Sequence, residues 1–280
     1  MMGEGAGFPE AWIRGAVFLA VFGSLAVLEL WSPRLERDEL RGALKTRRWF
    51  TNISMVVLSS LVLRIIFPAA AVGAALWAES RGWGVLRLAG LDGIVGGVIA
   101  FVMLDFAVWL EHVASHKIPL LWRIHRMHHA DTGFDVTTGL RFHPLEIVLS
   151  MFWKAAVVVV LGAPVLAVLI FEIVLNAGSM FSHSNLHIDK RVDRWLRRVI
   201  VTPDMHRVHH SNDLAETDSN YGFNLSLWDR LFRTYVSQPK KGHDGIAIGL
   251  SGYSASEAAR LGRSLALPFV SRPSAYVRRN

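Results

Sequence analysis

Long apolar stretches alternate with polar, histidine-rich stretches along this chain of 280 residues. The apolar stretches cover roughly residues 12–31, 53–77, 91–109 and 145–180. A helix needs about 20 apolar residues to cross the hydrocarbon core of a bilayer, so each of the first three predicts one crossing. The fourth is too long for one crossing, and Gly162-Ala163-Pro164 divides it into two halves. We therefore predict an all-α, multi-span transmembrane bundle that includes a helical hairpin with both ends on one side.

The second apolar stretch is interrupted by Arg64 and Pro68. A charged side chain inside a bilayer is costly unless it faces protein or water. Two interpretations stay open: the first half of this stretch lies along the membrane interface, or Arg64 points into the protein interior.

The composition fits this segregation, because apolar residues reach 52% while charged residues still make up 19%. The formal net charge is +7, and the basic residues lie in loops beside apolar stretches, which favours contact with anionic lipid headgroups over nucleic acid. The chain contains no cysteine. This excludes disulfides, an iron–sulfur cluster of its own and a thiol nucleophile, so nitrogen and oxygen must hold any metal.

Charge also predicts the orientation in the membrane. The loop over residues 33–49 is the strongest cytoplasmic candidate because of its basic residues. These are Arg34, Arg37, Arg41, Lys45, Arg47 and Arg48. With this loop inside, the third span and the hairpin return to the cytoplasm at His112 and at about His183. Glu4 and Glu10 precede the first span, where no cationic segment occurs, which favours a retained span over a cleaved signal peptide.

The expected organisation is one integral membrane domain over residues 1–240, in the inner membrane of a bacterium. Residues 241–280 are expected to form a basic cytoplasmic tail, in which Ser254 and Glu257 form a capping box that starts a short helix.

Ten of the twelve histidines form four clusters, two of them i, i+4 pairs and two of them H-x-x-H-H motifs. The clusters are His112 and His116; His125, His128 and His129; His183 and His187; and His206, His209 and His210. On a helix, residues i and i+4 project from nearly the same face, whereas the middle histidine of H-x-x-H-H points about 100° round the axis. One such helix can therefore supply ligands to two neighbouring ions. Shared between two ions, ten imidazoles give four or five to each.

Imidazole binds zinc, copper, iron and nickel, so the ligand type alone does not choose the metal. The number of ligands argues against a single zinc ion, which takes three or four. The sequence has no H-E-x-x-H motif, so the general base of a zincin protease is missing. We predict a dimetal centre in a cytosolic helical cap that residues 112–129 and 183–210 build.

Ligating imidazoles usually donate their second N–H to an acceptor, and four residues are candidates for this supporting role. Asp105 shares a helical face with the first histidine pair, with hydrogen bonding inside the bundle as the alternative. His143, at the entrance of the hairpin, either supports a ligand or is an ordinary polar residue. Asn220 and Asp229 follow the fourth cluster, where they reach an imidazole or only cap turns. His243 is expected to be solvated.

Five segments carry a family resemblance when taken together. They are His112-Val-Ala-Ser-His116, Leu121-Trp-Arg-Ile-His125-Arg-Met-His128-His129, Arg141-Phe-His-Pro-Leu-Glu146, Thr202-Pro-Asp-Met-His206-Arg-Val-His209-His210, and Asn220-Tyr-Gly through Trp228-Asp-Arg-Leu-Phe232. Over roughly residues 91–235 the chain resembles the fatty acid hydroxylase/sterol desaturase superfamily of membrane di-iron oxygenases. The resemblance implies a cytosolic dimetal centre and matches nine of the ten histidines to ligand positions. His187 matches less firmly, with Asn185 or a water as its replacement, and Val113 and Arg233 depart from the residues frequent in the family.

For function, the resemblance implies that two iron ions and O2 oxidise a C–H bond of a lipid or sterol-like substrate, by hydroxylation or desaturation. The sequence shows no flavin or haem motif, so electrons must come from a partner such as a ferredoxin or a cytochrome b5-like protein. The alternative is a non-catalytic or transport-type histidine-rich metal-binding membrane protein. A transporter needs ligands along a path at mid-membrane, whereas these clusters lie at the ends of spans and beyond.

Overall fold

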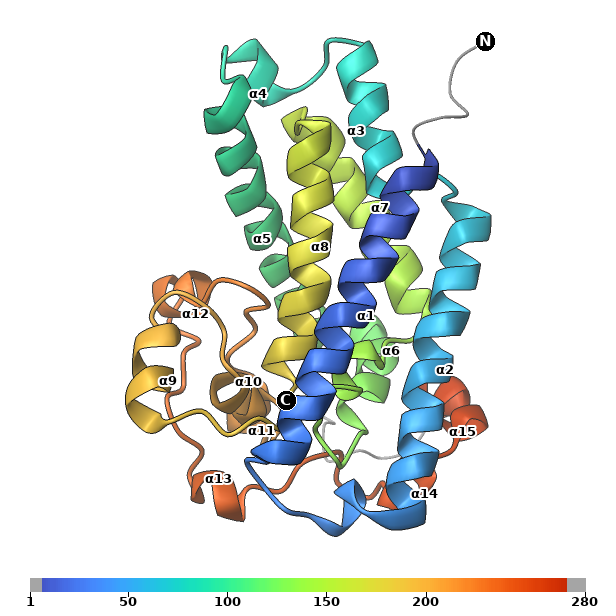
Figure 1. Cartoon of the computed structure of the whole chain (residues 1–280), viewed down its shortest axis with the longest axis vertical. Coiled ribbons are helices and arrows are strands. Elements are labelled where there is room, and N and C mark those ends of the chain that lie inside the picture. Colours follow the sequence, from blue (N-terminus) through green and yellow to red (C-terminus); the bar gives the residue numbers. More distant parts are fainter. Residues whose placement is uncertain (1–6, 271–280) are drawn as a thin grey trace.

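Figure 1 shows the computed structural model of the chain, which describes residues 7–270 as helices joined by loops, with no strand in that range. Glu4 and residues 271–280 of the predicted tail lie outside the described residues. The bundle consists of α1 (Gly7–Trp31), α2 (Gly42–Ile66), α3 (Ala70–Ser80), α4 (Val85–Leu88), α5 (Gly93–Lys117), α7 (Pro144–Leu161) and α8 (Val165–Ser182). Within the described range, 5 segments are long and apolar enough to cross a membrane, which confirms the predicted all-α multi-span fold.

The outer surface of these spans is apolar. In α1 and in α7, only 11% of the apolar window is buried inside the protein. Large side chains such as Ile65, Ile94 and Leu166 are exposed on the outside of the bundle. A protein in water rarely exposes so extensive an apolar surface, whereas lipid solvates it well. The chain is therefore an integral membrane protein.

The predicted hairpin is confirmed. Helix α7 ends at Leu161, and Gly162 then adopts a left-handed conformation (φ 64°, ψ 42°) that glycine reaches without a steric penalty. Pro164 lacks an N–H, and it precedes the first residue of α8. The turn also packs tightly, because a Cβ on Gly162 would lie 2.5 Å from the carbonyl oxygen of Trp83.

The second apolar stretch differs from its prediction in two ways. Helix α2 begins at Gly42, well before residue 53, because three polar residues of its first half, Arg48, Thr51 and Asn52, are buried inside the protein. The helix ends at Ile66, since Pro68 disfavours helical geometry in the residue before it. Arg64 is exposed, so the interpretation that it faces the protein interior is wrong.

The apolar core of the bundle lies between α3, α5, α7 and α8. Ala75, Leu104, Val158 and Phe171 are buried there in one cluster. Small alanines on α3 and α5 allow these helices to approach α7 and α8 closely. This packing fixes the end of α5, which carries the first histidine pair.

The remaining helices gather at one end of the bundle and form the cap (Figure 1). They are α6 (Pro119–His129), α9 (Lys190–Leu196), α10 (Pro203–His209), α11 (Leu214–Thr217), α12 (Leu227–Leu231), α13 (Gly242–Gly245), α14 (Ala255–Ala258) and α15 (Leu261–Ala266), with the 3-10 turns η1 (Asp38–Leu40), η2 (Thr138–Leu140) and η3 (Leu267–Phe269). The basic loop between α1 and α2 lies at the same end, where Arg34 Nε donates to Asp204 Oδ2 of α10 at 3.2 Å.

Residues 242–269 pack onto the cap. Leu267 is buried in a cluster with Met55 of α2 and Met127 of α6. Arg126 Nη2 donates to the Leu267 carbonyl oxygen at 2.8 Å. The capping box predicted at Ser254 is confirmed at the start of α14. This segment therefore covers the outer side of the helix that carries three of the predicted ligands.

Candidate metal centre

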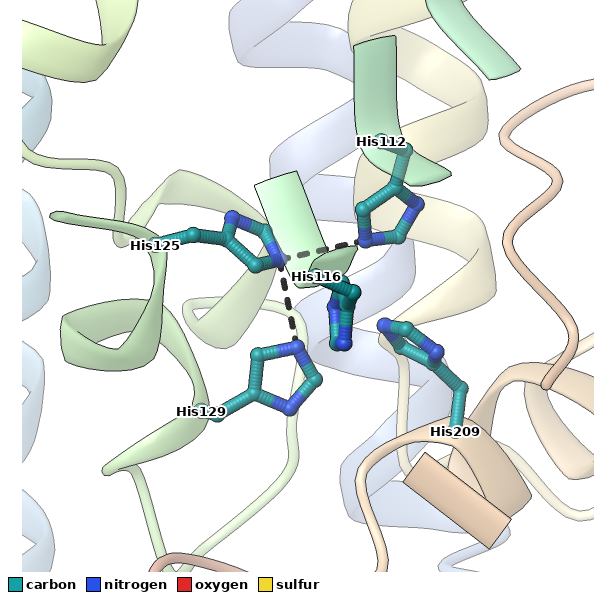
Figure 2. A group of neighbouring side chains, drawn as sticks. All are labelled: His112, His116, His125, His129 and His209. Carbon is teal, nitrogen blue, oxygen red and sulfur yellow. Dashed lines mark hydrogen bonds between the residues drawn. The ribbon is translucent and has the colours of Figure 1, made fainter. Parts of the chain in front are cut away.

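Nine of the ten predicted ligands meet in two neighbouring groups of buried imidazoles. Within each group, one ring nitrogen of every histidine lies within 4.8 Å of the others. Group one contains His112, His116, His125, His129 and His209, and group two contains His128, His183, His206 and His210. All nine side chains are at most 7% exposed. Figure 2 shows group one, with His125 and His129 approaching from one side and His209 from the opposite side.

The two H-x-x-H-H motifs are divided between the groups as their helical geometry predicts. On α6, His125 and His129 serve group one, and the middle residue His128 serves group two. On α10 the assignment is reversed, because His209 serves group one while His206 and the residue following the helix serve group two. Each motif therefore links both groups, so neither group can shift without the other. Proline starts both helices at the first turn, where its missing N–H has no intrahelical partner to lose.

Hydrogen bonds from Nδ1 orient five of the nine rings. Four of the acceptors are backbone carbonyls and one is a carboxylate, and none of these can donate, so Nδ1 must carry the proton. His112 donates to Tyr221 O (2.7 Å), His125 to Glu146 Oε1 (2.6 Å), His128 to Arg141 O (3.1 Å), His183 to Ser179 O (2.7 Å) and His209 to Ser219 O (2.7 Å). In a neutral ring this leaves the lone pair on Nε2, ready to bind a metal.

The contacts between Nε2 atoms provide a test of metal binding. Nε2 of His183 lies 3.0 Å from Nε2 of His128 and 3.1 Å from that of His210. His183 and His128 both donate through Nδ1. In the neutral state their Nε2 lone pairs therefore face one another and cannot form a hydrogen bond. Two nitrogens bound to one ion at about 2.1 Å lie about 3.0–3.4 Å apart. The observed spacing therefore fits a shared cation.

Burial keeps the rings in the neutral form that metals require. Burial, followed by repulsion from neighbouring imidazoles, lowers the pKa of His128, His129, His206 and His210 well below the ordinary value. Burial lowers the pKa of His183 to about 4. Nε2 of His209 is buried and has no hydrogen-bond partner among the described residues, which is costly unless a metal occupies that side.

His187 lies apart from both groups. Its side chain is exposed, and its backbone N–H donates to Ser32 O at 2.8 Å. Asn185, the suggested replacement ligand, uses its side chain on the backbone of Leu35, accepting from the N–H at 3.1 Å and donating to the carbonyl at 2.8 Å. The structure thus offers nine clustered imidazoles.

The predicted supporting residues stabilise the backbone around the rings. Asp229 accepts the backbone N–H groups of Tyr221 (2.9 Å) and Gly222 (2.8 Å). Asn220 Nδ2 donates to Met205 O of α10 at 2.9 Å. These bonds hold the loop over 219–222, whose carbonyls orient one ring of α5 and one of α10. Asp229 and Asn220 therefore bind the backbone that orients the rings, and their bonds described here do not reach an imidazole.

Asp105 and His143 also bind groups other than the imidazoles. Asp105 accepts from Asn224 Nδ2 (2.9 Å) and Trp228 Nε1 (2.8 Å), which is the alternative of hydrogen bonding inside the bundle. His143 caps α7 by accepting from the N–H of Leu145 at 3.2 Å, while its Nε2 donates to Leu265 O at 3.2 Å.

Two features were missed from the sequence. Glu146 lies in the first turn of α7 and binds His125 directly, and a carboxylate just after His143-Pro144 at the start of an apolar span was the available signal. His243 was expected to be solvated, and this is wrong. It is buried, with Nε2 3.6 Å from Asp204 Oδ2, because α13 packs against α10.

A buried ion-pair network supports the segment that follows α6. Arg48 of α2 binds both carboxylate oxygens of Asp131, at 2.6 and 3.0 Å, and also Asp135 at 3.2 Å. Burial alone would raise the pKa of Asp131, but the Arg48 guanidinium holds it below its ordinary value. Arg141 Nε donates to Met127 O at 3.1 Å, which connects this network to the helix of the second histidine motif.

An apolar cavity of about 160 Å³ opens beside group one. His112, His125 and Glu146 line it together with apolar side chains such as Phe18 and Leu175. Its polar lining also includes Glu111 and Lys154. A second apolar cavity, of about 340 Å³, lies between α5, α6 and α7 and shares Glu146 with the first. A cavity with apolar walls and a few polar groups is typical of a site for an apolar ligand.

These observations define the class of protein: an integral membrane helical bundle whose cap encloses two linked groups of buried imidazoles, spaced as metal ligands are. Residues 97–234 match the family model named Fatty acid hydroxylase, and this range contains all nine clustered histidines. This match, over just under half of the chain, confirms the resemblance to the fatty acid hydroxylase family.

Several curated relatives match about half of the chain. An ornithine lipid hydroxylase from Rhizobium tropici is 32% identical over 151 residues, which cover 54% of this chain and 45% of that protein. Alkylglycerol monooxygenases from Xenopus tropicalis and Homo sapiens are 29% and 25% identical, each over 51% of this chain and 31% of its own length. The chain thus spans less than half the length of these relatives. No solved structure shows a significant match.

Proposed function

We propose that this chain is a di-iron monooxygenase that uses O2 to hydroxylate a C–H bond of a membrane lipid. The observation that carries the proposal is the pair of linked imidazole groups. Group one offers five ligands and group two offers four. The family and the names of the relatives, which are lipid hydroxylases and monooxygenases, support iron and a lipid substrate over the other metals that imidazole binds. Desaturation of the same kind of bond, and a sterol-like substrate, belong to the same proposal.

Two iron ions would be held by the nine clustered histidines, one ion in each group. When bound, they supply the activation of O2. The chain itself keeps the imidazoles neutral by burial, fixes their tautomers through Nδ1, and excludes water from the centre. The cavity beside His112 and His125 holds an alkyl chain with one carbon next to group one.

The orientation and the electron supply complete the proposal. The basic loop at the cap end favours the cytoplasmic side, in a bacterial inner membrane. An external donor, either a ferredoxin or a cytochrome b5-like protein, delivers the electrons. The competing function, metal transport or storage, would use ligands distributed across the bundle, but all nine clustered rings lie in the cap or at the cap ends of α5 and α8.

The test is O2 consumption by the purified protein in lipid nanodiscs, with iron, a reductant and bacterial lipid extract, followed by lipid mass spectrometry. We expect lipid-dependent O2 uptake and a product 16 mass units heavier, or 2 lighter for desaturation. Bound iron without O2 uptake or lipid modification would favour transport or storage instead.

A further inference from the structure

Helices α9 and α12 carry large apolar side chains on their outer side. Trp195 of α9 is 67% exposed and Leu231 of α12 is 62% exposed, and Val199, in the loop just after α9, is also 62% exposed. In Figure 1 both helices lie beside the bundle, level with the lower half of α1, rather than beyond its end. This part of α1 belongs to the membrane-span candidate Trp12–Trp31. Helices α9 and α12 therefore lie at the level of a membrane-spanning segment.

This surface packs directly against a membrane-spanning helix. The ring of Phe232, at the end of α12, stacks on Trp109 at 4.7 Å and on Phe106 at 5.8 Å between centroids. Both partners belong to α5, which is long and apolar enough to span the membrane, and Trp109 is buried in this contact. Phe232 is itself 48% exposed, so an exposed apolar side chain of the cap lies directly beside the span.

The same surface is strongly basic. Its exposed cations are Lys190, Arg191, Arg194, Arg198, Arg230 and Arg233. Among residues 189–199 and 227–233 only one carboxylate, that of Asp189, is exposed. The others, Asp193 and Asp229, are buried, and Asp193 is paired with Arg197. Arginine and lysine extend apolar stems while holding their charge at a phosphate layer, and tryptophan prefers the same depth.

We propose that the exposed residues of 190–199 and 227–233, called here the α9–α12 surface, bind the headgroup layer of an anionic membrane leaflet. The cations pair with lipid phosphates, and the apolar side chains enter the outer part of the acyl region. An acidic protein partner would also satisfy the charges. The lipid is favoured because the exposed apolar side chains include Phe232, which packs against the membrane-spanning helix α5.

Lipid binding at this surface would stabilise the metal centre from outside. Asp229 of α12 holds the loop whose Tyr221 carbonyl orients His112. Helix α9 is followed directly by the segment that leads into α10, which carries His206 and His209.

The absence of cysteine in the sequence allows a clean depth measurement on the full chain in nanodiscs of phosphatidylcholine and phosphatidylglycerol. Single variants Trp195→Cys and Leu231→Cys carry a nitroxide label, and Ser256→Cys, exposed on α14, is the matched control. We expect both labels on the α9–α12 surface to collide more with O2 than with a water-soluble nickel complex, and the control to show the reverse. Three labels with the same water-accessible behaviour would overturn the proposal.

Charge reversal tests the headgroup specificity. Arg191→Glu with Arg194→Glu should lower the enrichment of phosphatidylglycerol over phosphatidylcholine around the protein at least about fivefold. Lys240→Glu with Lys241→Glu, a second exposed basic pair on the cap, should leave it within twofold of the unmodified chain. If the first double variant keeps the enrichment but raises the KM for an acidic electron-donor protein, the surface is a protein-docking site and the lipid proposal is wrong.

Discussion

Replacing Glu146 with glutamine removes the negative charge beside His125 while nearly preserving the volume of the side chain. Glu146 Oε1 accepts from His125 Nδ1 at 2.6 Å, and this carboxylate is the one side-chain acceptor among the five Nδ1 bonds described. His125 belongs to group one, whereas the Nδ1 bonds of His183 and His128 in group two end on the carbonyls of Ser179 and Arg141. The substitution therefore acts on one of the two proposed metal sites.

The expected size follows from the nature of this bond. Charge-assisted hydrogen bonds are about twice as strong as neutral ones, and removing such a partner of a metal-bound histidine typically lowers metal affinity about 10- to 100-fold. Glutamine still accepts the hydrogen bond, so we expect about a tenfold loss for Glu146→Gln, or about 1.4 kcal/mol. Glu146→Ala removes the acceptor entirely and should approach a hundredfold loss.

In the assay, an iron chelator competes with the iron-loaded protein under anaerobic conditions. The release of iron is followed and resolved into two steps, one for each proposed site. Glu111→Gln is the matched control, because Glu111 lines the same cavity but accepts from Ser150 at 3.1 Å rather than from an imidazole. We expect Glu146→Gln to weaken one step, and the control to leave both steps unchanged. If Glu146→Gln weakens both steps equally, or neither, the assignment of His125 to a separate site is refuted.

Four further substitutions test the ligands and their support. His209→Ala should lower bound metal and abolish turnover, while His187→Ala, which removes an exposed ring, should leave the metal content of the purified protein unchanged. Arg48→Met leaves Asp131 as an unpaired buried charge and should lower the free energy of unfolding by about 3–5 kcal/mol, measured by denaturation in detergent. Asp229→Ala leaves two buried backbone N–H groups without an acceptor, so we expect a loss of at least about 2 kcal/mol by the same measurement, together with weaker metal binding.

The spans, the hairpin and the grouping of the histidines were predictable because each depends on a pattern within one segment. Apolar length predicted the crossings, and Gly162 with Pro164 predicted the turn. The spacing in H-x-x-H-H predicted that the middle ring of each motif would point to a different ion from its neighbours, and the structure shows this division on both α6 and α10.

The supporting contacts were not predictable because they join segments far apart in the chain. The partner of His112 is the carbonyl of Tyr221, and a backbone carbonyl leaves no signature in the residue type. The polar first half of α2 looked like a loop, since the sequence does not show that Arg48 is buried against Asp131. His187 has the same spacing as a ligand pair, but α8 ends at Ser182, so the helical geometry that the pairing requires does not continue.

The most direct test of the central claim is anomalous diffraction at the iron absorption edge from crystals of the iron-loaded protein. We predict two iron peaks, one among the Nε2 atoms of group one and one among those of group two. A single peak, or iron outside the two groups, would contradict a two-iron centre built from nine imidazoles.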